Sequence, residues 1–160
     1  MPKELTLGTK ALIFSLPNET GATINLSDYE KRWVVLYFYP KDNTPGCTIE
    51  ALEFSTLAKN FKKEQATIFG ISKDSCTSHQ TFIINKKLTI QLLSDETTDI
   101  HKLYNVWKKK KFMGKSYMGC ERTTYLLDPQ GNIAYIWNNV KPEGHAQEVL
   151  KQLQELKTNE

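Results

Sequence analysis

The sequence predicts an α/β fold in which helices flank a central mixed β-sheet. Residues 33–39 (WVVLYFY), 66–72 (ATIFGIS) and 90–93 (IQLL) are largely apolar runs of the kind that form buried strands. Segments with the apolar spacing of helices separate these runs. Two more strand-like runs near the C-terminus are joined by the turn sequence DPQGN, and an amphipathic segment follows them. This order of elements predicts one sheet with helices packed against it.

Turn and capping signals divide the chain into elements. Ser27, with Glu30 three residues later, forms a capping box that predicts a short helix. Thr44 and Pro45 are typical of a helix start, since threonine can cap a helix and proline suits its first position. In chain order we expect a hairpin over 11–26, the short helix at 27–30, a strand over 33–39, a helix from Thr44 to about residue 64, a strand over 66–72, a helix opened by Ser75, a strand over 90–93, a helix near 98–107, strands over 123–127 and 133–137, and a helix over 143–156.

Length and composition limit the class of protein. The 160 residues are 39% hydrophobic and 24% charged, which suits one globular domain over residues 1–160. The basic residues are 19 lysines and only two arginines, whereas nucleic-acid readers depend more on arginine. No signal-peptide segment and no apolar run of membrane-spanning length occurs in the sequence. We therefore expect a cytoplasmic protein without a nucleic-acid or membrane partner.

The cysteines and histidines are scattered along the chain. Cysteines stand at positions 47, 76 and 120, an odd number without a CxxC pair, which fits neither a disulfide scaffold nor a zinc site. We expect the three histidines, His79, His101 and His145, on the surface or on helix faces. Because no His/Cys/carboxylate cluster is visible, we expect neither a metal nor a cofactor.

Cys47 stands where a thiol becomes reactive. If Thr44 caps the helix and Pro45 begins it, Cys47 is the third helical residue and its sulfur faces unpaired backbone N–H groups. Such a position favours the thiolate, which is the nucleophilic form. The Thr44 hydroxyl can reach the sulfur or a bound oxygen, and Pro40, which has no N–H, can shield the sulfur from water. The alternative is an inert cysteine that only fills the core.

The residues around Cys47 resemble a known family. Pro40-x-x-x-Thr44-x-x-Cys47 resembles the signature of the peroxiredoxins, and FYPKDNTPGCTIEA is similar to their Q-type subgroup, the bacterioferritin comigratory proteins. The likeness extends over nearly the whole chain, including GISKDS, LLSD and ERTTYLLDPQGNI. It implies a single thioredoxin-like domain, with the central mixed sheet, flanking helices and N-terminal hairpin, that acts as a thiol peroxidase.

The resemblance also implies roles for individual residues. Cys47 would be the peroxidatic cysteine that attacks hydrogen peroxide or an organic hydroperoxide and becomes a sulfenic acid. Thr44 would bind the peroxide and Pro40 would shield the sulfur. Arg122, in GCERTTYLL, matches the family arginine, and a guanidinium stabilises both a thiolate and a leaving oxygen.

The sequence departs from the Q-type pattern at the resolving cysteine. Relatives carry that cysteine at positions that correspond here to Leu52 or Ile83, two side chains that we expect to fill the core. Cys76 is an alternative resolving residue, and we expect Cys120 to be buried and inert. We favour regeneration by an external thiol such as thioredoxin, in a protein that is monomeric as many Q-type relatives are.

Two questions remain open at this stage. A redox-inert binding or chaperone-like module on the same fold is the alternative function, and the missing CxxC argues against a disulfide reductase. The lysine run at 108–111 predicts a solvated loop near the active site that steers polar or anionic partners.

Overall fold

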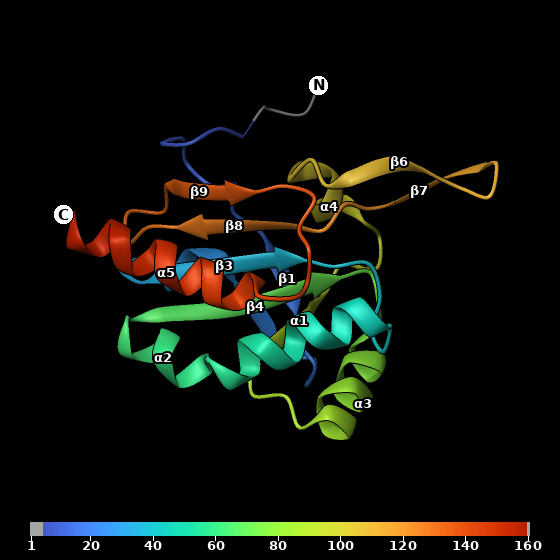
Figure 1. Cartoon of the computed structure of the whole chain (residues 1–160), viewed down its shortest axis with the longest axis horizontal. Helices are drawn as coiled ribbons and strands as arrows, with labels where there is room; N and C mark the ends of the chain where they lie inside the picture. The colour runs from blue at the N-terminus through green and yellow to red at the C-terminus, as the bar shows by residue number, and fades with distance from the viewer. Residues whose placement is uncertain (1–4, 160) are drawn as a thin grey trace.

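A five-stranded mixed sheet forms the centre of the molecule, as the sequence predicts (Figure 1). The structure is a computed structural model that describes residues 5–159. The sheet consists of β3 (Trp33–Phe38), β4 (Ala66–Ser72), β5 (Gln91–Ser94), β8 (Thr123–Leu127) and β9 (Ile133–Trp137). Its spatial order is β5–β4–β3–β8–β9, with β3, β4 and β5 parallel, β8 antiparallel to β3, and β9 antiparallel to β8.

The central strand β3 is buried on both faces. All six of its residues are buried, as its unbroken apolar sequence predicts. Successive side chains of a strand point to opposite faces, so Val35 and Tyr37 join one hydrophobic cluster while Leu36 and Phe38 join another. The sheet therefore separates two hydrophobic cores.

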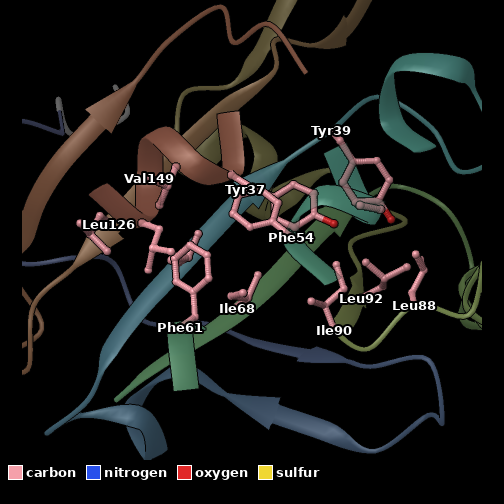
Figure 2. Close-up of a cluster of buried hydrophobic side chains, with 14 of the residues drawn as sticks. Tyr37, Tyr39, Phe54, Phe61, Ile68, Leu88, Ile90, Leu92, Leu126 and Val149 are labelled. Carbon is pink, nitrogen blue, oxygen red and sulfur yellow. The ribbon is translucent and has the colours of Figure 1, made fainter. Parts of the chain in front are cut away.

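Four helices cover the first face of the sheet. They are α1 (Pro45–Thr56), α2 (Ala58–Lys63), α3 (Cys76–Lys86) and α5 (His145–Thr158). Figure 2 shows side chains from α1, α2 and α5 beside those of the sheet, and α3 adds Phe82 to the same cluster. The rings of Tyr37 and Phe54 stack with centroids 4.6 Å apart, which binds α1 to β3 directly. This packing sets the position of the helix that begins beside Cys47.

The other face is covered by the N-terminal part of the chain and by a short helix. The expected hairpin is formed by β1 (Ser15–Pro17) and β2 (Thr23–Asn25), which pair antiparallel. The short helix α4 (Asp99–Leu103) lies further along the chain, and Tyr104 packs beside Phe14 and Phe38. Within residues 5–159, none of the helices has both the length and the apolar character that crossing a membrane requires.

The lysine-rich segment is a β-hairpin and not the loop that we expected. β6 (Trp107–Phe112) and β7 (Lys115–Cys120) pair antiparallel and project from the body of the molecule (Figure 1). Met113 and Gly114 have φ values of 50° and 79°, which suit a tight hairpin turn. The expected helix over 98–107 is likewise shorter, because Asn105 adopts a left-handed φ of 62° before β6 begins. Lysine is depleted in strands, so the run at 108–111 gives no strand signal in the sequence. The hairpin forms because the backbone groups of its two strands pair with each other whatever the side chains are.

Two helix predictions are also wrong in detail. The segment Leu26–Tyr29 is a 3₁₀ helix whose N-cap is Asn25, and Glu30 lies beyond its end in an extended conformation, so no capping box forms. The helix expected from Thr44 to about residue 64 is divided at Leu57, which is not helical. The hydroxyl of Thr56 donates to the carbonyl of Leu52 at 2.8 Å, a contact that weakens and bends helices.

Candidate active site

Cys47 lies in the first turn of α1, as the sequence predicts. Thr44 is the N-cap residue, Pro45 is the first helical residue, and the Cys47 side chain is buried with 1% exposed. Backbone N–H groups in the first turn of a helix have no partners within the helix and favour a negative charge. Figure 1 shows that α1 begins beside the end at which β3 finishes, which is where sites form in parallel sheets.

Arg122 reaches Cys47 from the other end of the chain. It stands between β7 and β8, and its Nη2 donates to the Cys47 Sγ at 3.4 Å. A Cβ atom added at Gly46 would lie 3.2 Å from the same nitrogen, so glycine leaves room for the guanidinium. The structure therefore brings together the thiol and the arginine that the sequence assigned to one site.

Glu50 is a third member of this group, and sequence reasoning missed it. Its Oε1 accepts a hydrogen bond from the Nη1 of Arg122 at 2.7 Å, and its side chain is fully buried. Burial raises the pKa of Glu50 to about 7, although the charge of Arg122 acts in the opposite direction. Within residues 5–159, its other oxygen, Oε2, has no hydrogen-bond partner. The signal was a glutamate three residues after Cys47, on the face of α1 that also carries the buried residues Cys47, Ala51 and Phe54.

The charges of Glu50 and Cys47 act together on the pKa of Arg122. Burial alone lowers the pKa of Arg122, but the charges of Glu50 and Cys47 outweigh it, and the net effect is a raised pKa. Arg122 is thus held as a cation with one nitrogen on Glu50 and the other on the sulfur. A planar guanidinium can bridge two acceptors in this way, which a lysine cannot do.

Pro40 and Thr44 stand in the loop that leads from β3 to α1. Both are half-buried. Thr44 occupies the N-cap position that we expected, but its hydroxyl makes no capping bond and donates instead to the carbonyl of Lys41 at 2.8 Å. The loop is fixed by Asp42, which accepts hydrogen bonds from Tyr39 at 2.6 Å and from His79 at 2.7 Å.

All three histidines lie in helices, as one half of the prediction states, but all are buried, so the alternative of a place on the surface is wrong. His79 and His101 are 0% exposed and His145 is 3% exposed. His101 pairs with Asp95 at 2.6 Å, as His79 does with Asp42. His145 contacts the Thr124 hydroxyl at 2.8 Å, and burial lowers its pKa to about 4. The partner of each histidine lies on another element or loop, and the apolar spacing of a helix does not reveal such contacts.

One group of side chains has the residue types of a cation site. The possible ligand atoms of Asp42, Asp74 and His79 lie within 4.8 Å of one another. These atoms already serve as hydrogen-bond partners, with Asp42 bonded to His79 and Asp74 accepting from the backbone N–H of Asp42 and the hydroxyl of Ser72. We assign no metal to this group.

The other two thiols differ in their surroundings. Cys76 is the first residue of α3 and is half-buried, whereas Cys120 is 4% exposed and burial raises its pKa to about 12. Ile83 packs partly buried against the first hydrophobic cluster, as expected. Leu52 is 40% exposed, so the prediction that it fills the core is wrong, since it stands on the outer face of α1.

Comparison with known proteins gives one consistent result. Residues 7–136 match the AhpC/TSA family. Peroxiredoxin Bcp of Bacillus subtilis is 41% identical, with 95% of this chain and 97% of the relative covered, and Peroxiredoxin Bcp of Escherichia coli is 37% identical, with 94% and 97% covered.

Solved structures agree with these relatives. A mutant of PrxQ from Xylella fastidiosa superposes with a TM-score of 0.92 at 38% identity, covering 97% of this chain and 99% of the other. The bacterioferritin comigratory protein of Xanthomonas campestris, solved in a study of its alkyl peroxide reduction, gives 0.85 at 39% identity, with 94% and 96% covered. Such agreement over almost the full length of both chains confirms the thioredoxin-like fold. The chain belongs to the AhpC/TSA family as a peroxiredoxin of the Bcp/PrxQ type, a thiol-dependent peroxidase.

Proposed function

We propose that Cys47 is the peroxidatic thiol and that it reduces hydrogen peroxide and organic hydroperoxides. The observation that carries the proposal is the contact of 3.4 Å between the Arg122 Nη2 and the Cys47 Sγ. This contact supplies a fixed positive charge to a thiol that also lies at the start of a helix. The alkyl peroxide reduction activity of the Xanthomonas campestris protein supports extending the substrates to organic hydroperoxides.

The proposed reaction is a displacement at a peroxide oxygen. The Cys47 thiolate attacks one oxygen, a sulfur–oxygen bond forms and the oxygen–oxygen bond breaks. The leaving oxygen takes a proton and departs as water or an alcohol, while Cys47 is left as a sulfenic acid. Arg122 stabilises the charge that develops on the leaving oxygen.

Thr44 and Pro40 are proposed to shape the peroxide site. The Thr44 hydroxyl, which donates to the carbonyl of Lys41, would turn to donate to the peroxide. Pro40 would shield the sulfur, since it offers no N–H to water and stands two residues before the Asp42 anchor. The half-buried position of both residues supports these roles.

We further propose that an external thiol such as thioredoxin regenerates Cys47. The buried surroundings of Cys120 disfavour it as a nucleophile, since burial raises its pKa to about 12. Leu52 and Ile83 carry no thiol at the positions where relatives resolve. Cys76 is the internal alternative. A monomer in the cytoplasm completes the proposal, and three free thiols suit the reducing conditions there.

Stopped-flow kinetics with peroxide, followed by trapping with dimedone, tests the role of Cys47. One equivalent of hydrogen peroxide should be consumed by the wild type and should produce a dimedone adduct on Cys47. The Cys47→Ser variant, checked for folding by circular dichroism, should do neither. An adduct found mainly on Cys76 or Cys120 would contradict the assignment, and an unreactive wild-type thiol would favour the redox-inert module.

A further inference from the structure

Asp42 is the centre of a buried hydrogen-bond network that the proposed reaction does not use. Its Oδ1 accepts from the hydroxyl of Tyr39 at 2.6 Å. Its Oδ2 accepts from the Nδ1 of His79 at 2.7 Å and from the hydroxyl of Ser78 at 2.8 Å. The backbone N–H of Asp42 donates to Asp74 at 2.8 Å. The network therefore ties the loop after β3 to the first turn of α3 at several points.

The side chains of His79 and Asp42 form a hydrogen-bonded pair in the protein interior. The two side chains are 0% and 2% exposed. The Nε2 of His79 lies 2.9 Å from the carbonyl oxygen of Leu93, so both ring nitrogens face oxygen acceptors. Both nitrogens donate when the imidazole is protonated and Asp42 is ionised. Removing one partner of a buried pair leaves the other charge uncompensated, so the pair resists separation.

The loop that Asp42 anchors carries the residues around the reactive sulfur. Pro40 and Thr44 each stand two residues from Asp42, and Cys47 follows three residues after Thr44. Asn43 adopts a left-handed φ of 62°, a conformation that a non-glycine residue keeps when its surroundings hold it. The position of Asp42 therefore determines where the peroxide-binding residues lie.

The opposite end of the network lies beside Cys76. Cys76 stands three residues before His79, and the first turn of α3 is closed by the Ser78 N–H, which donates to the Ser75 hydroxyl oxygen at 3.1 Å. A disulfide between Cys76 and Cys47 requires their Cα atoms to come within roughly 7 Å in a suitable orientation. Ser78 and His79 both lie in this turn and both bond to Asp42, so opening it breaks these contacts.

We infer that His79 and Asp42 are positioning residues whose hydrogen-bonded pair orients the Cys47 loop toward Arg122 and keeps Cys76 from resolving the sulfenic acid. The inference rests on the proposed peroxidatic role of Cys47. With the pair intact, an external thiol attacks the Cys47 sulfur, the sulfur–oxygen bond breaks, and the hydroxyl leaves with the thiol proton as water. With the pair broken, the thiol of Cys76 makes the same attack and forms an internal disulfide.

A second buried pair offers a matched control. His101 and Asp95 are joined at 2.6 Å, and their side chains are 0% and 1% exposed. The ring of His101 packs against Phe38 and Trp107, and its pair makes no hydrogen bond to the loop before Cys47 within the described structure. Loss of this pair removes a buried contact between a histidine and an aspartate from the interior without touching that loop.

The test compares His79→Gln with His101→Gln by intact mass spectrometry after one equivalent of hydrogen peroxide without reductant. The wild type and His101→Gln should keep a species heavier by about 16 Da that dimedone traps. His79→Gln should form the disulfide at least about tenfold faster than the wild type does. The disulfide species is lighter than the reduced protein by about 2 Da, and adding Cys76→Ser should abolish its formation. The second-order rate constant of His79→Gln with hydrogen peroxide should fall by about tenfold or more relative to the wild type, because the loop before Cys47 is misplaced.

Asp42→Asn guards against a folding defect in His79→Gln, since asparagine keeps an acceptor for Tyr39 and loses the charge together with the acceptor that His79 and Ser78 use. Both variants are first checked by circular dichroism and by titration of accessible thiols. Equal behaviour of the folded His79 or Asp42 variants and His101→Gln, in both disulfide formation and peroxide rate, would overturn the inference. Rapid disulfide formation in the wild type would also overturn the inference, whereas absence of both a trapped sulfenic acid and a disulfide in the wild type would refute the role of Cys47 itself.

Discussion

Cys47 and Cys120 are both buried thiols, yet their sulfurs have different hydrogen-bond partners. Cys47 is 1% and Cys120 4% exposed. The sulfur of Cys47 accepts a hydrogen bond from the guanidinium of Arg122 at 3.4 Å. The thiol of Cys120 ends a strand among apolar side chains and donates to the carbonyl of Glu121 at 3.4 Å. Burial therefore does not decide reactivity, and the neighbours of each sulfur do.

The largest expected effect comes from replacing Cys47, with the same replacement at Cys120 as the comparison. Cys47→Ser should lower the rate constant for hydrogen peroxide by at least about 10³-fold, because a serine hydroxyl stays protonated and is a poor nucleophile. Cys120→Ser should stay within about twofold of the wild type, since burial raises the pKa of its thiol to about 12. Stopped-flow measurement at pH 7 decides between them. A Cys47→Ser variant that kept a tenth of the activity would refute the contrast.

The next effect concerns the cation that distinguishes the two thiols. Arg122→Lys should lower the same rate constant by about 10²- to 10³-fold, because an ammonium group cannot bridge the sulfur and Glu50 as a planar guanidinium does. Arg32, the other arginine of the chain, is exposed, so Arg32→Lys is the matched control and should leave the rate unchanged. An Arg122→Lys rate within a few-fold of the wild type would contradict the bridging role.

The smallest expected effect is on stability and arises from Glu50. Burial raises the pKa of Glu50 from 4.5 to about 7, so between these pH values the folded protein binds more protons than the unfolded chain. The free energy of unfolding should therefore fall by up to about 3 kcal/mol as the pH rises from 4.5 to 7.

Urea denaturation at several pH values, on the wild type and on Glu50→Gln, measures this contribution. Other titrating groups are shared by the two proteins and cancel in the difference between them. The variant should lack the decline that Glu50 causes. Parallel stability curves for the two proteins would show that Glu50 does not titrate as its burial predicts.

Local patterns in the chain were enough to predict the sheet and the start of the reactive helix. The strand at Trp33–Phe38 was predicted because a run without polar residues suits a strand buried on both sides. Cys47 was assigned to the first helical turn because Thr44 and Pro45 stand directly before it and helix starts depend on neighbours in sequence. Such features involve residues close along the chain, so the sequence contains them directly.

Contacts between distant residues were beyond these patterns. Glu50 lies 72 positions from Arg122, and Asp42 lies 37 positions from His79. Without the resemblance to a family, Arg122 itself would have been one charged residue among many. The burial of the histidines and the hairpin at the lysine run depend in the same way on partners that only the folded chain supplies. Hydrophobic periodicity records which face of an element is buried, whereas a hydrogen bond or ion pair forms only when packing brings two separate elements together.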